Sequence, residues 1–202
     1  IRSVKNTQQI TRALKFVAAA KLRRAQERAL AARPYAREMQ RVLRSAMARI
    51  ENPKFPLMAH RPEERILVLV LTGNKGLCGA FNTNVIRRAL VFLREHAQQR
   101  VRVIPIGKKG RDALRKRRLD LADEYVNLSA SVEFSQAKEI ASRVIEMFSS
   151  GEVDAVYAVF NEFKSVLTQR LLVEKVLPIE AEQPCDDERS KADDDQLERL
   201  AA

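Results

Sequence analysis

The sequence is poor in several residue types, and each shortage excludes a class of function. Its 202 residues contain no Trp and only 5% aromatics, so a surface on which nucleic-acid bases stack is not expected. The two cysteines, Cys78 and Cys185, belong to no CxxC pair and have no histidine nearby, which argues against structural zinc and thioredoxin-like chemistry. We interpret both as inert thiols in a reducing compartment. His60 and His96 are isolated, so no Ser/His/Asp or Cys/His constellation can be assembled.

Long apolar runs are also missing. The longest, residues 66–71, is far shorter than the roughly 20 residues of a membrane-spanning helix. The basic, periodic start lacks the compact apolar segment of a signal peptide. The run Asp193, Asp194 and Asp195 lacks the spacing of an EF-hand, so we expect a solvated loop there. The sequence predicts no catalytic residue, no metal site and no cofactor.

Positive charge is concentrated at the start of the chain. The net charge is +11, and residues 1–50, with thirteen Lys/Arg against Glu27 and Glu38, account for all of it. Residues 180–202 are acidic instead, with nine acids against three bases. A charge localised in this way indicates that the N-terminal segment faces an acidic partner.

Residues 1–50 have the composition of one long helix, rich in Ala, Leu, Arg, Lys and Gln and without Gly. From residue 25 onward, apolar residues recur at alternating spacings of four and three, which predicts a coiled-coil seam. Its members are Ala25, Ala29, Ala32, Ala36, Met39, Leu43, Ala46 and Ile50. Upstream, Ile10, Leu14 and Val17 continue an apolar stripe in a shifted phase, and Pro34 should bend the helix. Such a seam needs a second helix, either from another chain or from chain beyond these residues.

After a proline-containing connector, strands and helices alternate. We predict strands at residues 66–72, 101–106, 153–160 and 165–178, with a brief additional strand at 124–128. The predicted helices are residues 81–98, 108–118 and 135–149, the last capped by Ser135. Alternation predicts an open, mostly parallel sheet with helices on its faces. The last two strands, joined by a turn at residues 161–164, are linked too tightly for a crossover and should form an antiparallel hairpin.

The predicted fold class is therefore α/β: a long N-terminal coiled-coil helix plus a Rossmann-like domain that ends in a hairpin. We expect the helix at residues 1–52, the connector at 53–65 and the α/β domain at 66–180. Residues 181–202 then form an acidic polar segment that leads to a C-terminal helix outside the sequence.

Residues 72–82 follow the first predicted strand, where a doubly wound sheet binds phosphate. Their glycines are spaced GxxGxxG, which matches neither the dinucleotide fingerprint nor the P-loop. We therefore favour a structural turn over a nucleotide-binding enzyme that uses residues 73–79. In that turn Gly76 and Gly79 supply positive φ and Cys78 is a small packed side chain.

Two basic regions leave an alternative open. Residues 107–118 contain seven basic residues, which could bind nucleic acid or anionic lipid headgroups. We favour a solvated helix face or a contact with an acidic subunit. A nucleic-acid-binding protein with a basic helical arm is the alternative for the whole chain. The alanine-rich seam argues against it, because a free arm would be polar on all sides.

Four blocks of the sequence resemble the gamma subunit of F-type ATP synthases. Residues 1–26 read IRSVKNTQQITRALKFVAAAKLRRAQ, and residues 76–84 read GLCGAFNTN. The third block is GKKGR at residues 107–111, and the fourth combines NEFKS at 161–165, Gln169-Arg170 and LPI at 177–179. The blocks follow the family's order. The loop departs from it, because TGNK at residues 72–75 stands where the family usually has Ser-Asp-Arg/Lys.

The resemblance implies two long helices wound as an antiparallel coiled coil beside an α/β domain. It implies a non-catalytic central-stalk rotor subunit that couples proton-driven rotation of a membrane rotor ring to ATP synthesis or hydrolysis. The implied partners are the alpha and beta subunits, the epsilon subunit and the rotor ring, and not nucleic acid. The implied location is peripheral, on the cytoplasmic face of a bacterial inner membrane or an equivalent coupling membrane.

The resemblance also implies contact residues toward the alpha–beta ring. The family's beta subunits offer an acidic lever loop, and basic residues of the first block supply the opposite sign. Exposed ion pairs contribute about 0–1 kcal/mol each, which suits contacts that are made and broken. The expected contact residues are Lys5, Ile10, Arg12, Leu14, Lys15, Lys21, Arg23 and Arg24.

Overall fold

The computed structural model describes residues 2–47, 55–126, 128, 134–165 and 168–179. The chain divides into two compact units, Ile1–Pro53 and Lys54–Ala202. None of the helices in the described ranges combines the length and the apolarity that a membrane span requires. The acidic segment predicted at residues 181–202, with Cys185 and the three consecutive aspartates, lies outside the described residues.

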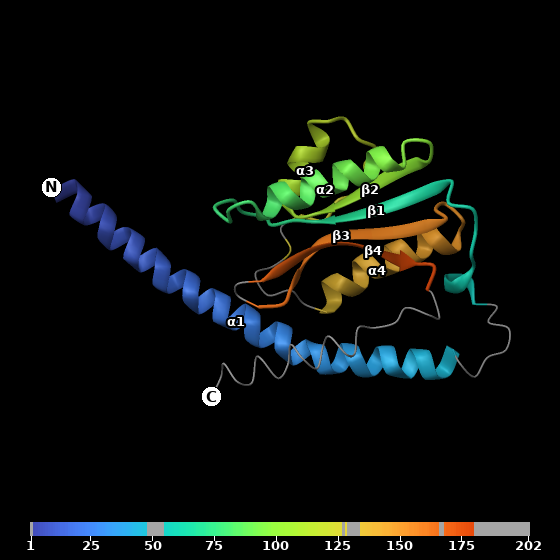
Figure 1. Ribbon diagram of the computed structural model, residues 1–202, viewed down its shortest axis with the longest axis horizontal. Coiled ribbons are helices and arrows are strands. Elements are labelled where there is room, and N and C mark those ends of the chain that lie inside the picture. Colours follow the sequence, from blue (N-terminus) through green and yellow to red (C-terminus); the bar gives the residue numbers. More distant parts are fainter. Residues whose placement is uncertain (1, 48–54, 127, 129–133, 166–167, 180–202) are drawn as a thin grey trace. The chain divides into compact units, whose positions relative to one another are not determined.

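The described part of the first unit is one helix, α1 (Arg2–Met47), of 46 residues. At 1.5 Å per residue its length is roughly 70 Å. Strong helix formers occupy most positions, and Arg23 pairs with Glu27 one turn later, with Nε 2.9 Å from Oε1. The helix continues through Pro34, and its axis bends along its length (Figure 1). The predicted long N-terminal helix is confirmed.

The second unit is built on a four-stranded sheet with strand order β2-β1-β3-β4. The strands are β1 (Arg65–Leu71), β2 (Arg100–Ile106), β3 (Ala155–Phe163) and β4 (Gln169–Leu177). β1 runs parallel to both of its neighbours, and β4 pairs with β3 in an antiparallel hairpin. This arrangement confirms the predicted fold class.

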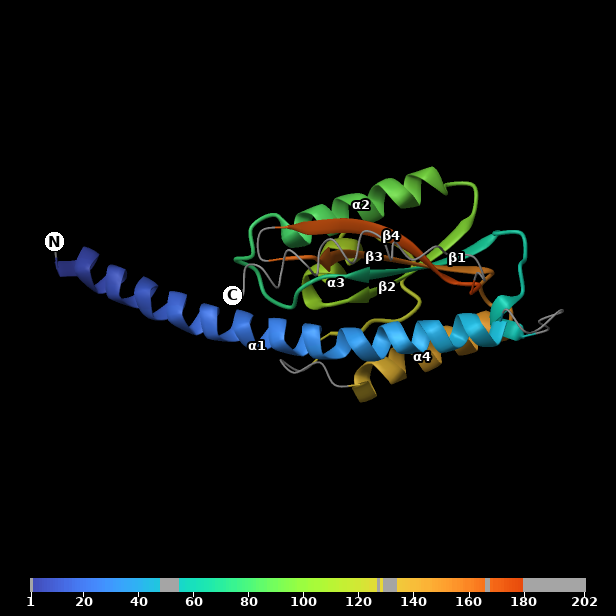
Figure 2. The same cartoon turned by 60° about the horizontal axis from the view of Figure 1, so that its bottom comes forward.

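Helices cover both faces of the sheet. α2 (Phe81–Glu95) and α3 (Lys108–Arg115) lie on one face and α4 (Phe134–Ser149) on the other, as Figures 1 and 2 show, while a short 3-10 helix, η1 (Pro56–Met58), precedes β1. Successive residues of a strand point to opposite faces. Ile66, Val68 and Val70 therefore pack with α2 and α3, whereas Leu67 and Leu69 pack with α4. Burial on both faces explains why residues 66–71 of β1 are all apolar rather than alternating with polar ones.

The segment after α3 differs from the prediction. We expected a brief strand at residues 124–128, but the described residues there form only an isolated bridge, between Tyr125 and Ile106 of β2. The amide of Tyr125 donates to the carbonyl of Pro105 over 3.0 Å, and its carbonyl accepts from the amide of Gly107 over 2.8 Å. The amide of Glu124 donates instead to Oδ1 of Asp123 over 2.8 Å. Among the described residues of the predicted strand, pairing with β2 is therefore limited to Tyr125.

The hairpin and the start of α4 also differ from the prediction. The turn expected at residues 161–164 is wrong, because β3 continues to Phe163, which pairs with Gln169. The connection comes later, where the amide of Thr168 donates to Oγ of Ser165 over 3.0 Å. Polar side chains at residues 161–162 suggested a turn, but strand pairing uses backbone groups and tolerates them. Ser135 lies inside α4 and is not its N-cap.

Candidate functional site

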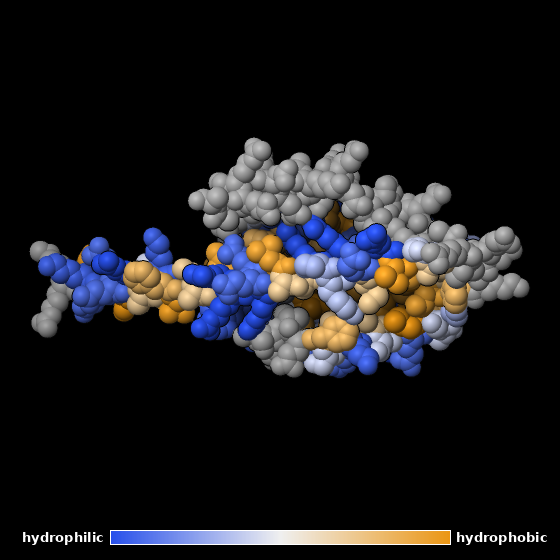
Figure 3. All heavy atoms as spheres, turned by 90° about the horizontal axis from the view of Figure 1, so that it is seen from below, coloured by the Kyte–Doolittle hydropathy of each residue, from blue (hydrophilic) through white to orange (hydrophobic). Residues whose placement is uncertain are grey.

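α1 carries an apolar row that stays exposed. Ile10, Leu14 and Val17 are spaced by four and three residues, so they lie on one side of the helix. Their exposed fractions are 62%, 62% and 53%. Figure 3 shows apolar and hydrophilic side chains next to one another along α1. An apolar helix row normally packs against another surface, so this row is a candidate contact site.

The same row becomes basic farther along the helix. Continuing the alternate spacing from Val17 leads to Lys21, Arg24 and Arg28. None of these three forms an ion pair with any residue that the structure describes. The row therefore changes from apolar to positively charged between Val17 and Lys21, which is about one helical turn.

The other predicted contact residues lie on a different side of α1. Lys5 and Arg12 are seven residues apart, which is about two helical turns. Arg23 follows Arg12 by eleven residues, which is about three turns, so all three lie on one side of the helix. Lys15 lies one turn from Arg12. Of these residues, Arg23 is the one paired with Glu27. The predicted set thus occupies two sides: Ile10, Leu14, Lys21 and Arg24 on one, and Lys5, Arg12, Lys15 and Arg23 on the other.

The predicted coiled-coil seam is likewise open. Met39 and Leu43 belong to it, and both are exposed large apolar side chains. The alanines between residues 25 and 36 have small side chains, so the backbone of another helix can approach this part of α1 closely. Ile50, the last predicted seam residue, lies outside the described residues.

In the second unit, two glycine-containing loops meet at the carboxyl ends of β1 and β2. Oγ1 of Thr72, directly after β1, accepts a hydrogen bond from the amide of Gly110 over 2.8 Å. A Cβ on Gly110 would lie 2.7 Å from that oxygen, and a Cβ on Gly107 would collide with the Thr72 backbone. Gly107 also has a φ of +107°, which L residues rarely adopt. The two glycines therefore allow α3 to begin directly against Thr72.

Two asparagines hold the same loops together. Oδ1 of Asn74 accepts a hydrogen bond from the amide of Lys108 over 3.0 Å. Oδ1 of the buried Asn82 accepts one from the amide of Gly73 over 2.8 Å. That amide stands where a nucleotide phosphate would bind, and it is already bonded within the chain. The sequence analysis did not single out Thr72, Asn74 or Asn82, although all three lie in or beside the matched second block.

The tip of the first loop differs in detail from the prediction. Gly79 has the expected positive φ, +57°, but the other left-handed residue is Leu77, with φ of +59°, and not Gly76. Cys78 is an exposed free thiol, so the expectation of a packed side chain is wrong. Its Sγ lies 3.0 Å from Nδ2 of Asn82. The turn is held by Asn82 from beneath, which leaves Leu77 and Cys78 at the surface.

The basic segment at residues 107–118 is partly neutralised within the unit. Arg115 and Arg111 both pair with Glu124, at 2.8 Å (Nη2–Oε2) and 3.8 Å (Nη1–Oε1). Lys108 and Lys116 are exposed. The segment therefore combines an internal ion-pair network with a solvated basic side.

An ion pair that the sequence analysis missed joins the start of β1 to β3. Asp154 is 3% exposed. Its Oδ2 accepts hydrogen bonds from the backbone amide of Arg65 (2.9 Å) and from Nε (3.0 Å), and its Oδ1 accepts one from Nη2 (2.7 Å). These hydrogen bonds lower the pKa of the Asp154 carboxyl, although burial opposes them.

A second network joins the connector to β3 and β4. The hydroxyl of Tyr157 donates to Oε2 of Glu63 over 2.8 Å, and Nζ of Lys175 lies 2.9 Å from Oε1. Burial raises the pKa of Glu63, but the hydrogen bonds from Lys175 and Tyr157 outweigh it, and the pKa is lowered. The partners are far apart in sequence, 94 residues for Glu63 and Tyr157, so no local motif announces them.

Neither histidine joins a site. His60 and His96 each place Nδ1 beside a backbone carbonyl, 3.0 Å from Met58 and 2.9 Å from Phe92 respectively. In the described ranges no group of three or more His, Cys, Asp or Glu residues is arranged to hold a metal ion.

Comparison with known proteins assigns the family. A family model described as ATP synthase matches residues 1–201. The chain belongs to the ATP synthase family. Its curated relatives include the ATP synthase gamma chain of Solibacter usitatus, 50% identical over 184 residues that make up 89% of this chain and 64% of the relative. The gamma chain of Pelotomaculum thermopropionicum is 44% identical over 180 residues, which cover 89% and 63%.

These matches confirm the resemblance to gamma subunits of ATP synthase that the four blocks indicated. The chain spans less than two thirds of the length of these relatives. A chain in the cryo-EM structure of the central stalk and c-ring of the Tetrahymena thermophila mitochondrial ATP synthase has a TM-score of 0.68. It is 23% identical and covers 92% of this chain and 84% of its own length, and at that identity the likeness shows the shared fold alone.

Proposed function

We propose that this chain is part of a gamma subunit, the central-stalk rotor subunit of an ATP synthase. In this role it couples proton-driven rotation of a membrane rotor ring to ATP synthesis or hydrolysis at catalytic sites in a ring of alpha and beta subunits. The chain itself holds no active site and no cofactor. Its partners are the alpha and beta subunits, the epsilon subunit and the rotor ring. It is attached to the membrane through the complex, on the cytoplasmic face of a bacterial inner membrane or its equivalent.

The observation that carries this proposal is α1, a 46-residue helix whose large apolar residues are exposed. A helix of roughly 70 Å exceeds the diameter of a small domain, so its apolar rows need cover from a second long helix or from neighbouring subunits. Membership of the ATP synthase family, with relatives named gamma chain, points to the same assembly. The proposed domain limits are residues 1–52, 53–65, 66–180 and 181–202.

The two sides of α1 suit a rotating shaft. One side is apolar at Ile10 and Leu14 and basic from Lys21, while the other is basic from Lys5 to Arg23. Turning such a helix presents a different surface to each neighbour in turn. Exposed charge pairs contribute about 0–1 kcal/mol each, so they form and break without holding the shaft in one position.

The basic residues are tested by charge reversal. The triple variant Arg12→Glu, Lys21→Glu and Arg23→Glu should weaken association with the cognate alpha and beta subunits, because it places negative charges among the positive ones on both sides of α1 and lowers the net charge of the helix by six. Co-purification with these subunits and ATP-driven rotation of the assembled complex measure the effect. The matched control is Arg87→Glu, Lys116→Glu and Lys138→Glu, which makes the same charge change at exposed positions of the second unit. Normal assembly and rotation of the first triple variant would show that the charges of α1 have no such role.

A further inference from the structure

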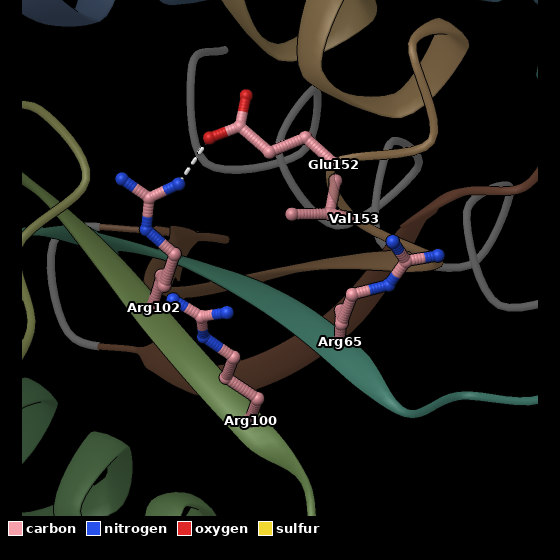
Figure 4. A pocket seen from close by; sticks show the side chains of 5 residues that line it. All are labelled: Arg65, Arg100, Arg102, Glu152 and Val153. Carbon is pink, nitrogen blue, oxygen red and sulfur yellow. Dashed lines mark hydrogen bonds and ion pairs between the residues drawn. The ribbon is translucent and has the colours of Figure 1, made fainter.

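A small cavity lies at the amino-terminal end of the parallel strands, at the opposite end from the glycine loops. Its volume is about 130 Å³, and it is lined by Arg65, Arg100, Arg102, Glu152 and Val153 (Figure 4). Arg65 and Arg100 are paired in register on β1 and β2. Arg102 is two residues farther along β2, so all three arginines point to the same face of the sheet, the face covered by α4.

The carboxylates around the cavity are unevenly distributed over the three arginines. Asp154 uses both of its oxygens on Arg65. Arg102 pairs with Glu152, as the dashed line in Figure 4 shows, and lies 3.7 Å from Asp120. Arg100 is exposed, and none of the described residues forms an ion pair with it. Arg100 is thus the guanidinium with unused donors.

The carboxylates also differ in how easily they can move. The side chain of Asp154 is 4% exposed and fixed by three hydrogen bonds, so it stays with Arg65. The side chain of Glu152 is 39% exposed and follows α4 in a turn, so it can rotate into water. When it does, the guanidinium of Arg102 becomes available beside that of Arg100.

We propose that this cavity binds a phosphate group, with Arg100 as the main donor and Glu152 as an internal competitor for Arg102. Planar guanidinium groups match the oxygens of phosphate, which offers more acceptors than a carboxylate does. The volume is below the roughly 300–1,000 Å³ of sites for drug-sized ligands, so one phosphate group fits better than a whole nucleotide. Asp120, Glu152 and Asp154 pair with two of the three arginines and so compete with phosphate for their guanidinium groups. This site does not depend on the proposed function.

The test is a titration of the 202-residue chain with inorganic phosphate at constant ionic strength, followed by the NMR signals of the arginine side chains. The wild-type signals should shift saturably. Arg100→Gln should raise the Kd about tenfold, as expected for one charge-assisted hydrogen-bond donor. Glu152→Gln should lower the Kd by a similar factor, because it frees Arg102. Arg87→Gln, at an exposed arginine of α2 without an ion pair to any described residue, is the matched control.

Glu152→Gln guards against misfolding, because a damaged fold does not bind more tightly. No saturable shift, an unchanged Kd in Arg100→Gln, or weaker binding in Glu152→Gln overturns the proposal. The source of the phosphate is distinguished by sedimentation with vesicles of phosphatidic acid against phosphatidylcholine. If Glu152→Gln increases and Arg100→Gln decreases the fraction bound to phosphatidic acid relative to Arg87→Gln, the site takes a lipid headgroup. If the variants alter the binding of inorganic phosphate alone, it takes a soluble phosphate.

Discussion

Replacing Asp154 with Asn should destabilise the second unit by about 2 kcal/mol at neutral pH. The substitution keeps the shape of the side chain and removes the charge that accepts three hydrogen bonds from Arg65. A hydrogen bond to a charged group contributes about 1.5–3 kcal/mol, and removing one partner of a buried pair costs still more. The side chain of Arg65 is 45% exposed, however, so water replaces part of what is lost.

The loss should depend on pH in a definite direction. Hydrogen bonds from Arg65 hold the pKa of Asp154 below its ordinary value. The ionised carboxylate therefore stabilises the fold at pH values above its pKa in the unfolded chain. That contribution disappears as the pH falls through the lowered pKa of the folded state. Wild type and Asp154→Asn should differ most at neutral pH and converge in acid.

Urea unfolding at neutral and acid pH measures the difference. Tyrosine fluorescence follows the second unit once Tyr35 of α1 is replaced by Phe in all the proteins compared, because the chain has no Trp and its other two tyrosines, Tyr125 and Tyr157, lie in that unit. Glu95→Gln is the matched control, since Glu95 forms an exposed pair with Arg88 and its loss should cost at most about 0.5 kcal/mol. An equal loss at both pH values, or no loss at neutral pH, would refute the assignment of a stabilising ionised pair.

Three further substitutions test the loops and the network around Glu63. Gly107→Ala should cost about 3 kcal/mol or more in urea unfolding, because a Cβ there meets the Thr72 backbone at an unfavourable φ. At Gly79 a Cβ would have no neighbouring atom within 4 Å, so Gly79→Ala should lower the free energy of unfolding by only about 1 kcal/mol. An equal loss of stability in Gly107→Ala and Gly79→Ala would contradict the steric argument. Tyr157→Phe should cost about 1 kcal/mol and raise the pKa of Glu63, which loses a hydrogen-bond donor. An unchanged Glu63 titration by carboxyl NMR would count against that bond.

Periodic features were predictable from the sequence. The composition of residues 1–50 defines α1, and the apolar run at residues 66–71 identifies the central strand. The order of strands and helices then leads to the parallel sheet and its final hairpin, because few topologies satisfy short, right-handed connections. These inferences use local sequence patterns. The secondary structure that a local pattern favours is found in the folded protein when the tertiary contacts favour it as well.

Long-range polar contacts were not predictable in the same way. Arg65 and Asp154 are 89 residues apart, and Arg100 of β2 lies beside Arg65 of β1 in the sheet register. Only the register of the sheet brings them together, and register is not visible in one sequence. Thr72 and Gly110 meet for the same reason, although two matched blocks flank their contact. The strand expected at residues 124–128 shows the converse, because a suitable composition there gives only one bridge to β2, at Tyr125, among the described residues.

Residues 66–70 of β1 are buried on both faces of the sheet, and this places a constraint on the second unit. Among them, the odd-numbered residues belong to the apolar cluster under α4, and the even-numbered residues belong to the cluster under α2 and α3. Displacement of β1 from one cluster therefore also disrupts the other. We therefore expect the two helical layers to unfold in one step. The seven residues of β1 also connect Arg65 at the arginine cavity directly to Thr72 at the glycine loops. A displacement of the backbone at one end of this strand is therefore transmitted to the other end through seven consecutive residues of regular strand.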